Sequence, residues 1–224
     1  MLGKPDRVFD GKSYSLKLKL KDGATFLEVP EFHVQEKGAD GKYHTVQKVT
    51  DVSGDLHNVV VKTGEYEGQP IRTFTLWLTD VPNKERYFVD VGLGSSLGRT
   101  LANSVLNLKA FENVQVGLYS QKSQKDDGKT YPAVSLRQGN AKDTVKWRFR
   151  PEDGQLPPAR EFAGKGGKIE KDWTATEEFL YGELEKFGAA LNKRAPAAQP
   201  AEPAAAAPKE EKPAATNIDE DVPF

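Results

Sequence analysis

The chain has 224 residues, 37% hydrophobic and 29% charged, which suits one substantial domain with appendages or two small domains. It contains no cysteine, which excludes disulfide scaffolds, thiolate zinc sites and cysteine nucleophiles. No apolar run reaches the roughly 20 residues needed to span a bilayer, and the first residues lack the apolar stretch of a secretory signal. We therefore expect a soluble intracellular protein without membrane association.

The net charge of −1 conceals an uneven distribution of charge along the chain. Residues 195–224 contain six acids and two lysines, a net charge of −4, whereas the preceding residues have a net charge of +3. Within 117–150, eight basic residues accompany three acids. A basic body with an acidic tail predicts a polyanion-binding surface beside a separate interaction arm.

Alternating apolar and polar residues predict strands along most of the body. The expected strands are 14–20, 25–35, 43–49, 58–63, 71–79, 86–91, 111–120, 131–138 and 144–150. Turn-forming pairs such as Asp22-Gly23, Asp40-Gly41 and Pro82-Asn83 separate several of them.

Apolar residues spaced by three and four predict two helices, at 95–108 and 173–192. Thr174 and Glu177 have the spacing of a capping box at the start of the second helix. This helix carries an apolar stripe of Trp173, Leu180, Leu184, Phe187 and Leu191. The stripe must be buried, either against the body or in a partner subunit, so homo-oligomerisation stays open.

Several strands, a helix and then a hairpin is the order expected of an oligonucleotide-binding (OB) fold, where a helix separates the third and fourth barrel strands. For residues 1–194 we predict a mainly β, OB-fold-like barrel with one inserted helix and an additional C-terminal helix. The loop between its fourth and fifth strands would be 121–129. Residues 195–217, rich in Ala and Pro, predict a disordered linker, and 218–224 form a short acidic tip.

The last six residues are the most specific feature of the sequence. An acidic run, Asp219, Glu220 and Asp221, precedes Val222, Pro223 and the terminal Phe224. This ending, after a Pro/Ala-rich linker, resembles the C-terminal tip of bacterial and bacteriophage single-stranded DNA-binding proteins. The match is confined to the tip and linker, and the body diverges. The resemblance implies docking on replication, recombination and repair proteins, in the cytoplasm of a bacterial or phage-infected cell.

Physical chemistry agrees with a docking role for this tip. The Phe224 ring can fill an apolar pocket while its free carboxylate pairs with a basic residue at the rim. Pro223 restricts Val222 to extended conformations, which reduces the entropy lost on binding. The acids would steer the tip toward a basic surface, and we expect them to compete with DNA for the body.

Binding of single-stranded DNA needs cations along the backbone path and aromatic faces for stacking. Strand alternation places Trp77, Phe88, Tyr119 and Tyr131 on polar faces, and we predict that they stack on bases. In 145–150 the same alternation assigns Val145, Trp147 and Phe149 to the core. The predicted phosphate contacts are Arg72, Arg86, Lys122, Lys125, Lys129, Arg137, Lys146, Arg148 and Arg150.

No pattern in the sequence predicts catalysis, a metal or a cofactor. The three histidines are widely separated, and the glycines of 92–98 fit strand-to-helix packing better than a dinucleotide-binding turn. We expect a non-enzymatic protein that binds single-stranded DNA without strong sequence preference. Two alternatives remain: an annealing or duplex-binding recombination factor, and a protein-interaction adaptor without DNA binding.

Overall fold

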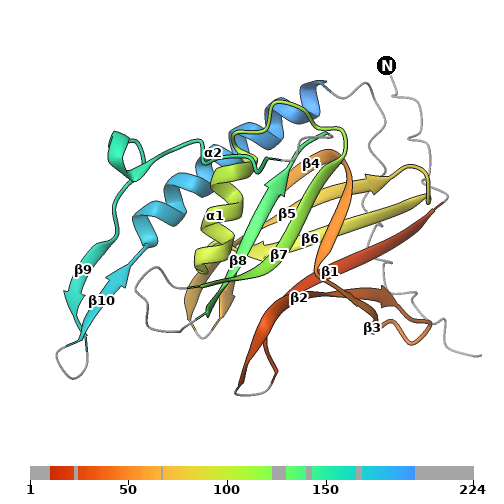
Figure 1. Ribbon diagram of the computed structural model, residues 1–224, viewed down its shortest axis with the longest axis horizontal. Helices are drawn as coiled ribbons and strands as arrows, with labels where there is room; N and C mark the ends of the chain where they lie inside the picture. The colour runs from red at the N-terminus through yellow and green to blue at the C-terminus, as the bar shows by residue number, and fades with distance from the viewer. Residues whose placement is uncertain are drawn as a thin grey trace, which may run out of the picture.

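The computed structural model describes residues 11–22, 25–66, 68–122, 130–139, 143–164 and 168–194 (Figure 1). The predicted linker, 195–217, and tip, 218–224, lie outside the described residues. The elements are β1 (Lys12–Asp22), β2 (Thr25–Lys37), β3 (Tyr43–Val49), β4 (Asp51–Tyr66), β5 (Gln69–Asp80), β6 (Glu85–Gly92), α1 (Ser96–Val105), β7 (Val114–Lys122), β8 (Thr130–Arg137), the 3-10 turn η1 (Pro151–Asp153), β9 (Arg160–Ala163), β10 (Ile169–Asp172) and α2 (Thr174–Arg194).

Eight strands form one strongly curled half-barrel sheet in the order β3-β2-β1-β6-β5-β4-β7-β8. Its neighbours are antiparallel except β1 and β6, which are parallel. The long strand β4 pairs with β7 through residues 51–54 and with β5 from Asp55 onward. Strands β4 to β8, with α1 between β6 and β7, therefore follow the strand and helix order of an OB barrel. The prediction of a mainly β, OB-like fold is confirmed.

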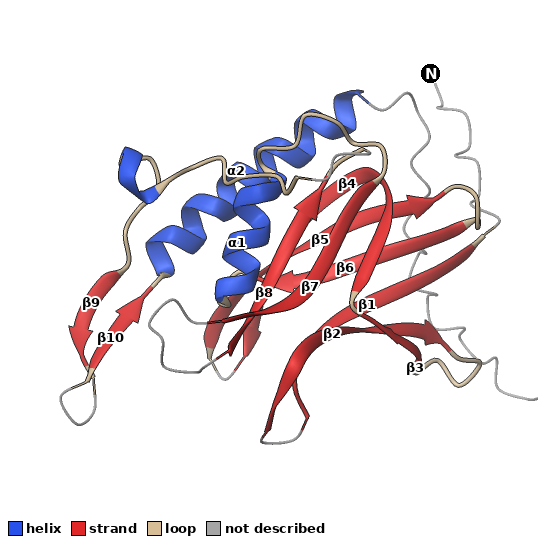
Figure 2. Ribbon diagram, in the orientation of Figure 1, coloured by secondary structure: helices blue, strands red, loops and turns tan. Residues whose placement is uncertain are grey.

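Alternation along the strands divides the sheet into an inner and an outer face. The inner face carries buried apolar side chains from β1, β2 and β4 to β8, including Leu16, Phe74 and Val116. Both helices lie on this side of the sheet, and their leucines join the same core (Figure 2). The outer face carries the opposite residues of each strand and is the surface on which the predicted stacking residues lie.

Helix α1 begins against the end of β6 because two residues allow a close approach. The Ser95 hydroxyl accepts a hydrogen bond from the Gly98 amide at 2.9 Å, as a helix N-cap does. A Cβ atom on Gly98 would lie 1.9 Å from the Gly92 carbonyl oxygen, so only glycine fits there. Gly98 therefore serves strand-to-helix packing, as the sequence predicts for this segment.

Helix α2 packs on β4, β5 and α1 of its own chain, which decides how its apolar stripe is buried. Leu180, Leu184 and Leu191 are buried in the common core. A Cβ on Gly188 would meet the Val59 carbonyl oxygen at 2.2 Å, so the helix touches the β4 backbone directly. At the start of the helix, the Arg99 guanidinium lies 4.4 Å from the centre of the Trp173 ring, a cation–π contact.

Two local expectations differ from the structure. The predicted strand at 144–150 is wrong: this segment is irregular, while the short strands β9 and β10, which the pattern did not predict, form a separate hairpin. The capping box is also wrong, because the Thr174 hydroxyl donates to Asp172 Oδ1 at 2.6 Å and Asp172 also accepts the Thr174 amide at 2.9 Å. Asp172 thus supplies the side-chain oxygen at this helix start.

Two glycines of α2 test the close approach of the helix to β4. We expect Gly188→Ala to reduce the free energy of unfolding by about 2 kcal/mol, because the added methyl overlaps the Val59 carbonyl. Gly182→Ala, whose Cβ would enter open space, should increase stability by about 0.5–1 kcal/mol through helix propensity. Urea unfolding of the two variants measures both values. Equal effects would show that Gly188 does not set the helix–sheet distance.

Candidate nucleic-acid interface

The outer face of β7 and β8 carries two exposed tyrosines beside a shallow groove. Tyr119 and Tyr131 are 43% and 51% exposed. Tyr119 pairs with Ala133 and Tyr131 pairs with Gln121, so the two tyrosines are diagonal neighbours on the same face. The groove continues along both strands from Tyr119 and has a volume of about 350 Å³. It is lined by Thr50, Asp51, Gln115, Gly117, Leu118, Tyr119, Ser135, Arg137 and Thr144.

Two small residues keep the groove open at its centre. Gly117 of β7 pairs with Ser135 of β8, between Tyr119 at one end and the Gln115–Arg137 pair at the other. A Cβ on Gly117 would meet only the Ser135 hydroxyl, at 3.0 Å. The centre of the groove floor is therefore backbone and one hydroxyl, flanked by Asp51, which pairs with Gly117 from β4, whereas an aromatic ring and a guanidinium lie at its ends. Such a floor lets a flat group rest against the sheet.

Next to the groove, α1 holds residues 146–150, which we call the basic segment, in a defined conformation. The Asn103 side chain is 2% exposed; it donates to the Phe149 carbonyl at 2.7 Å and accepts the Phe149 amide at 2.8 Å. The Arg148 amide donates to the Asn103 carbonyl at 3.1 Å, and the Asn107 side chain donates to the Lys146 carbonyl at 3.1 Å. Lys146, Arg148 and Arg150 are exposed, so the segment presents three cations from a fixed backbone.

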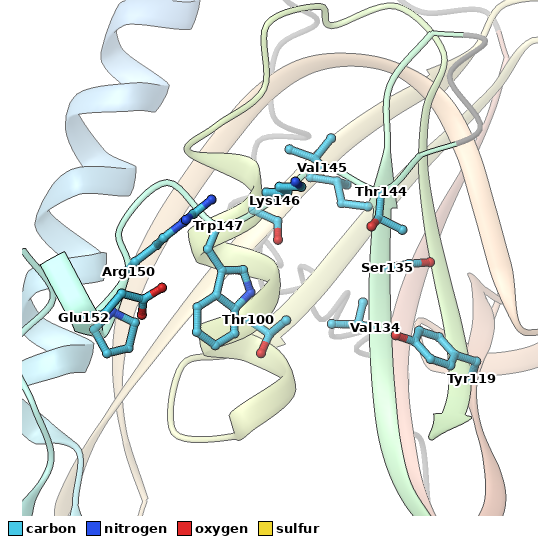
Figure 3. A pocket seen from close by; sticks show the side chains of 13 residues that line it. Thr100, Tyr119, Val134, Ser135, Thr144, Val145, Lys146, Trp147, Arg150 and Glu152 are labelled. Atoms are coloured by element: carbon cyan, nitrogen blue, oxygen red, sulfur yellow. The ribbon is translucent and has the colours of Figure 1, made fainter. Parts of the chain in front are cut away.

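A cleft of about 500 Å³ lies between α1, the edge of β8 and residues 144–152 (Figure 3). Three residues, Tyr119, Ser135 and Thr144, line both this cleft and the groove, so the two are continuous. Trp147 lines the cleft and is 41% exposed. Its sequence assignment to the core is wrong, because 144–150 is not a strand and alternation does not apply there.

Trp77 and Phe88, the other predicted stacking residues, form a pair on the outer face of β5 and β6. Their side chains are opposite in the strand register, with ring centres 5.3 Å apart in an edge-to-face arrangement. Both are half-buried. In OB folds the face of the second and third barrel strands binds oligonucleotides, and β5 and β6 have these positions here. The predicted aromatic residues thus divide between two parts of one outer face.

Arg72 and Arg86 are placed away from the groove. Arg72 lies on the inner face and pairs with Glu178 of α2 at 2.7 Å, so it helps to hold the helix. Arg86 lies on the outer face beside the aromatic pair, is 9% exposed, and burial lowers its pKa. Burial also lowers the pKa of the nearby His57, an effect that Asp55 opposes and Arg86 increases.

The remaining predicted cations divide between the groove and the undescribed loop. Arg137 is exposed and lines the groove. Lys122 is exposed at the end of β7, where the loop predicted to join the fourth and fifth barrel strands begins. Lys125 and Lys129 lie outside the described residues, as do the tip residues from Asp219 to Phe224. Groove, basic segment and cleft therefore bring together Tyr119, Arg137, Lys146, Arg148 and Arg150, and Tyr131 is the diagonal neighbour of Tyr119.

No protein-family model matches this chain, and no curated protein or solved structure matches it. The described part of the chain contains no group of histidine and acidic side chains that could hold a metal ion. Neither described helix is long and apolar enough to cross a membrane. The residues that line the interface offer aromatic rings for stacking, hydroxyls for hydrogen bonding and cations that attract anions.

The amide of Asn103 offers a direct test of how the basic segment is held. Asn103→Ala would leave both the amide and the carbonyl of Phe149 without their side-chain partner, and we expect a loss of about 2–3 kcal/mol in the free energy of unfolding. Asn107→Ala removes a single bond at a more exposed site and should cost less than about 1 kcal/mol. Chemical denaturation gives the stabilities, and amide hydrogen exchange at Phe149 reports the local effect. Unchanged exchange in Asn103→Ala would contradict this account.

Proposed function

We propose that this protein binds single-stranded DNA along its outer face, with the groove on β7 and β8 as the central part of the path. The observation that carries the proposal is the pair of exposed tyrosines, Tyr119 and Tyr131, on a face where Tyr119 shares a cleft with a basic segment whose backbone is fixed by α1. Aromatic faces and backbone-tracking cations are what sequence-independent binding of single strands requires. The OB-like order of β4 to β8 agrees with this function.

The dimensions of the face suit an extended strand. Tyr131 and Arg137 are six residues apart on β8, which corresponds to about 20 Å along the sheet. Bases would stack on the tyrosines while phosphates pass Arg137 and the basic segment. Because stacking needs only a base with a free face, binding should show little sequence preference. The Trp77–Phe88 pair extends the same outer face and would contact a longer strand.

The C-terminal tip completes the proposed function. Its acidic residues and terminal Phe224 resemble the docking tip of single-stranded DNA-binding proteins, and the linker would let it reach partners while the body holds DNA. We propose that it recruits proteins of replication, recombination or repair in the cytoplasm of a bacterial or phage-infected cell. The protein would protect transient single strands and act without catalysis or a cofactor.

The tyrosine pair is the first target for mutation. The double variant Tyr119→Ala/Tyr131→Ala should bind oligo-dT at least tenfold more weakly, since each stacked base contributes about 1–3 kcal/mol. Tyr43→Ala, an equally exposed tyrosine on the edge strand β3, is the matched control and should bind like the wild type. Fluorescence anisotropy with labelled oligo-dT and a matched duplex, at low and moderate salt, measures these affinities.

The outcomes of this titration separate the proposal from its rivals. Binding that weakens as salt rises and is stronger for oligo-dT than for duplex supports single-strand binding. Equal affinity for both would favour an annealing or duplex-binding factor, and no binding to either would favour an adaptor. Trp77→Ala, measured in parallel, shows how much the β5–β6 part of the face contributes. If only Trp77→Ala weakened binding, the path would lie there instead of on β7 and β8.

Removal of the acidic tail should change DNA affinity in the opposite direction from the tyrosine substitutions. A chain ending at Arg194 loses a net charge of −4 and the tip, so it should bind oligo-dT more tightly than the full chain at low salt. The difference should shrink as salt rises, because ions screen the attraction between the tail and the basic surface. Anisotropy titrations of both chains over a salt series test this. Identical affinities at low salt would exclude competition between tail and DNA.

A further inference from the structure

The cleft beside α1 has walls from three separate parts of the chain. Thr100 and Ser104 of α1 form one side, Val134 and Leu136 at the edge of β8 form another, and residues 144–152 close it. Figure 3 shows the Trp147 side chain lying within these walls. At about 500 Å³ the cleft falls within the range of pockets that take small organic ligands. It is therefore large enough for one nucleotide.

Trp147 is exposed in the cleft, yet its main chain is held on both sides. The Lys146 carbonyl before it accepts from Asn107, and the Arg148 amide after it donates to the Asn103 carbonyl. Two residues before Trp147, the Val145 amide donates to the Leu136 carbonyl at 2.7 Å, which holds the segment against the edge of β8. Because the backbone of Trp147 is already fixed, less conformational entropy is lost when a second ring covers its indole. The cleft thus offers a ready stacking surface.

The polar groups around the indole match a nucleotide of any base. Hydroxyls of Thr100, Ser104 and Thr144 each donate and accept hydrogen bonds, so they can satisfy different base edges. Lys146 and Arg150 line the same cleft and supply positive charge for a phosphate, while Glu152 is an acidic lining residue. The cleft accordingly favours an anionic ligand with a flat ring, and it should accept any of the bases.

The cleft is also reached directly from the groove, because Tyr119, Ser135 and Thr144 belong to both. A strand lying on the tyrosines could therefore direct one base over the β8 edge without leaving the surface. A duplex could do this only after a base had been unpaired and unstacked, which costs a few kcal/mol. Occupation of the cleft consequently distinguishes single strands from duplex.

We propose that this cleft takes one unpaired nucleotide of the bound strand, with its base on Trp147 and its phosphate near Lys146 and Arg150, and that this contact selects single strands over duplex. The inference rests on the proposed function and adds a separate site to the groove. Trp147 would be a specificity-determining residue. Cations on a surface do not distinguish one strand from two, so the Trp147 contact would add to the preference that stacking on the outer-face tyrosines already gives.

Substitution of Trp147 tests the selection directly. Trp147→Ala should weaken oligo-dT binding about tenfold or more and leave duplex binding within about twofold, so the preference for single strands falls. Trp147→Phe keeps a stacking ring and should retain most of the preference. Urea unfolding checks that both variants fold, as expected for a side chain that is 41% exposed. An equal loss for both DNA forms, or no loss, would overturn the inference.

The three tryptophans provide a second, independent readout. With Trp77→Phe and Trp173→Phe, Trp147 is the sole tryptophan, and oligo-dT should quench its fluorescence while duplex does not. With Trp77→Phe and Trp147→Phe, the remaining Trp173, covered by Arg99, should not respond. Unquenched Trp147 in a chain whose anisotropy shows oligo-dT binding would refute the cleft and spare the proposed function. Absence of any anisotropy change with wild type would refute both.

Discussion

The bend of β4 is the constraint on which the rest of the molecule depends. This strand leaves β7 at Gly54 and continues along β5 from Asp55. A Cβ on Gly54 would lie 2.9 Å from the carbonyl carbon and oxygen of Thr79, so the strand passes β5 at a distance that only glycine allows. Because β4 turns here, one core is shared by both arms of the sheet, and their outer residues form a single surface.

The hydrogen bonds of Asn103 have a comparable role for the interface. An irregular segment beside a sheet edge has backbone groups that no ladder satisfies, and leaving them unpaired when buried is costly. A buried asparagine with one donor and one acceptor matches the amide and carbonyl of Phe149, as a neighbouring strand would. The basic residues therefore extend outward from a backbone that is tied to α1, and Phe149 packs against Phe179 of α2 with ring centres 4.9 Å apart.

Most of the fold could be predicted from the sequence because the alternation of apolar and polar residues corresponds to the two faces of the observed strands. On β5, β7 and β8 the apolar set is buried and the predicted aromatic residues Trp77, Tyr119 and Tyr131 lie on the opposite face. The same rule failed for Trp147, since 144–150 alternates without pairing as a strand. The partners that hold this segment are polar residues on a helix about 40 positions earlier, which no local pattern indicates. Arg72 was predicted to contact phosphate, but it pairs with Glu178 of α2, a partner that is distant in sequence and that no local pattern indicates.

Charge alone would not make the groove and cleft a strong site for DNA. Their lining includes three cations, Arg137, Lys146 and Arg150, and two carboxylates, Asp51 and Glu152. With so small an excess of positive charge, counterion release from this lining would be modest, and stacking on Tyr119, Tyr131 and Trp147 would have to supply much of the affinity. Stacking requires unpaired bases, whereas phosphate contacts do not. A weakly basic path rich in aromatic rings therefore favours single strands over duplex, and it leaves an acidic tail able to compete for the few cations present.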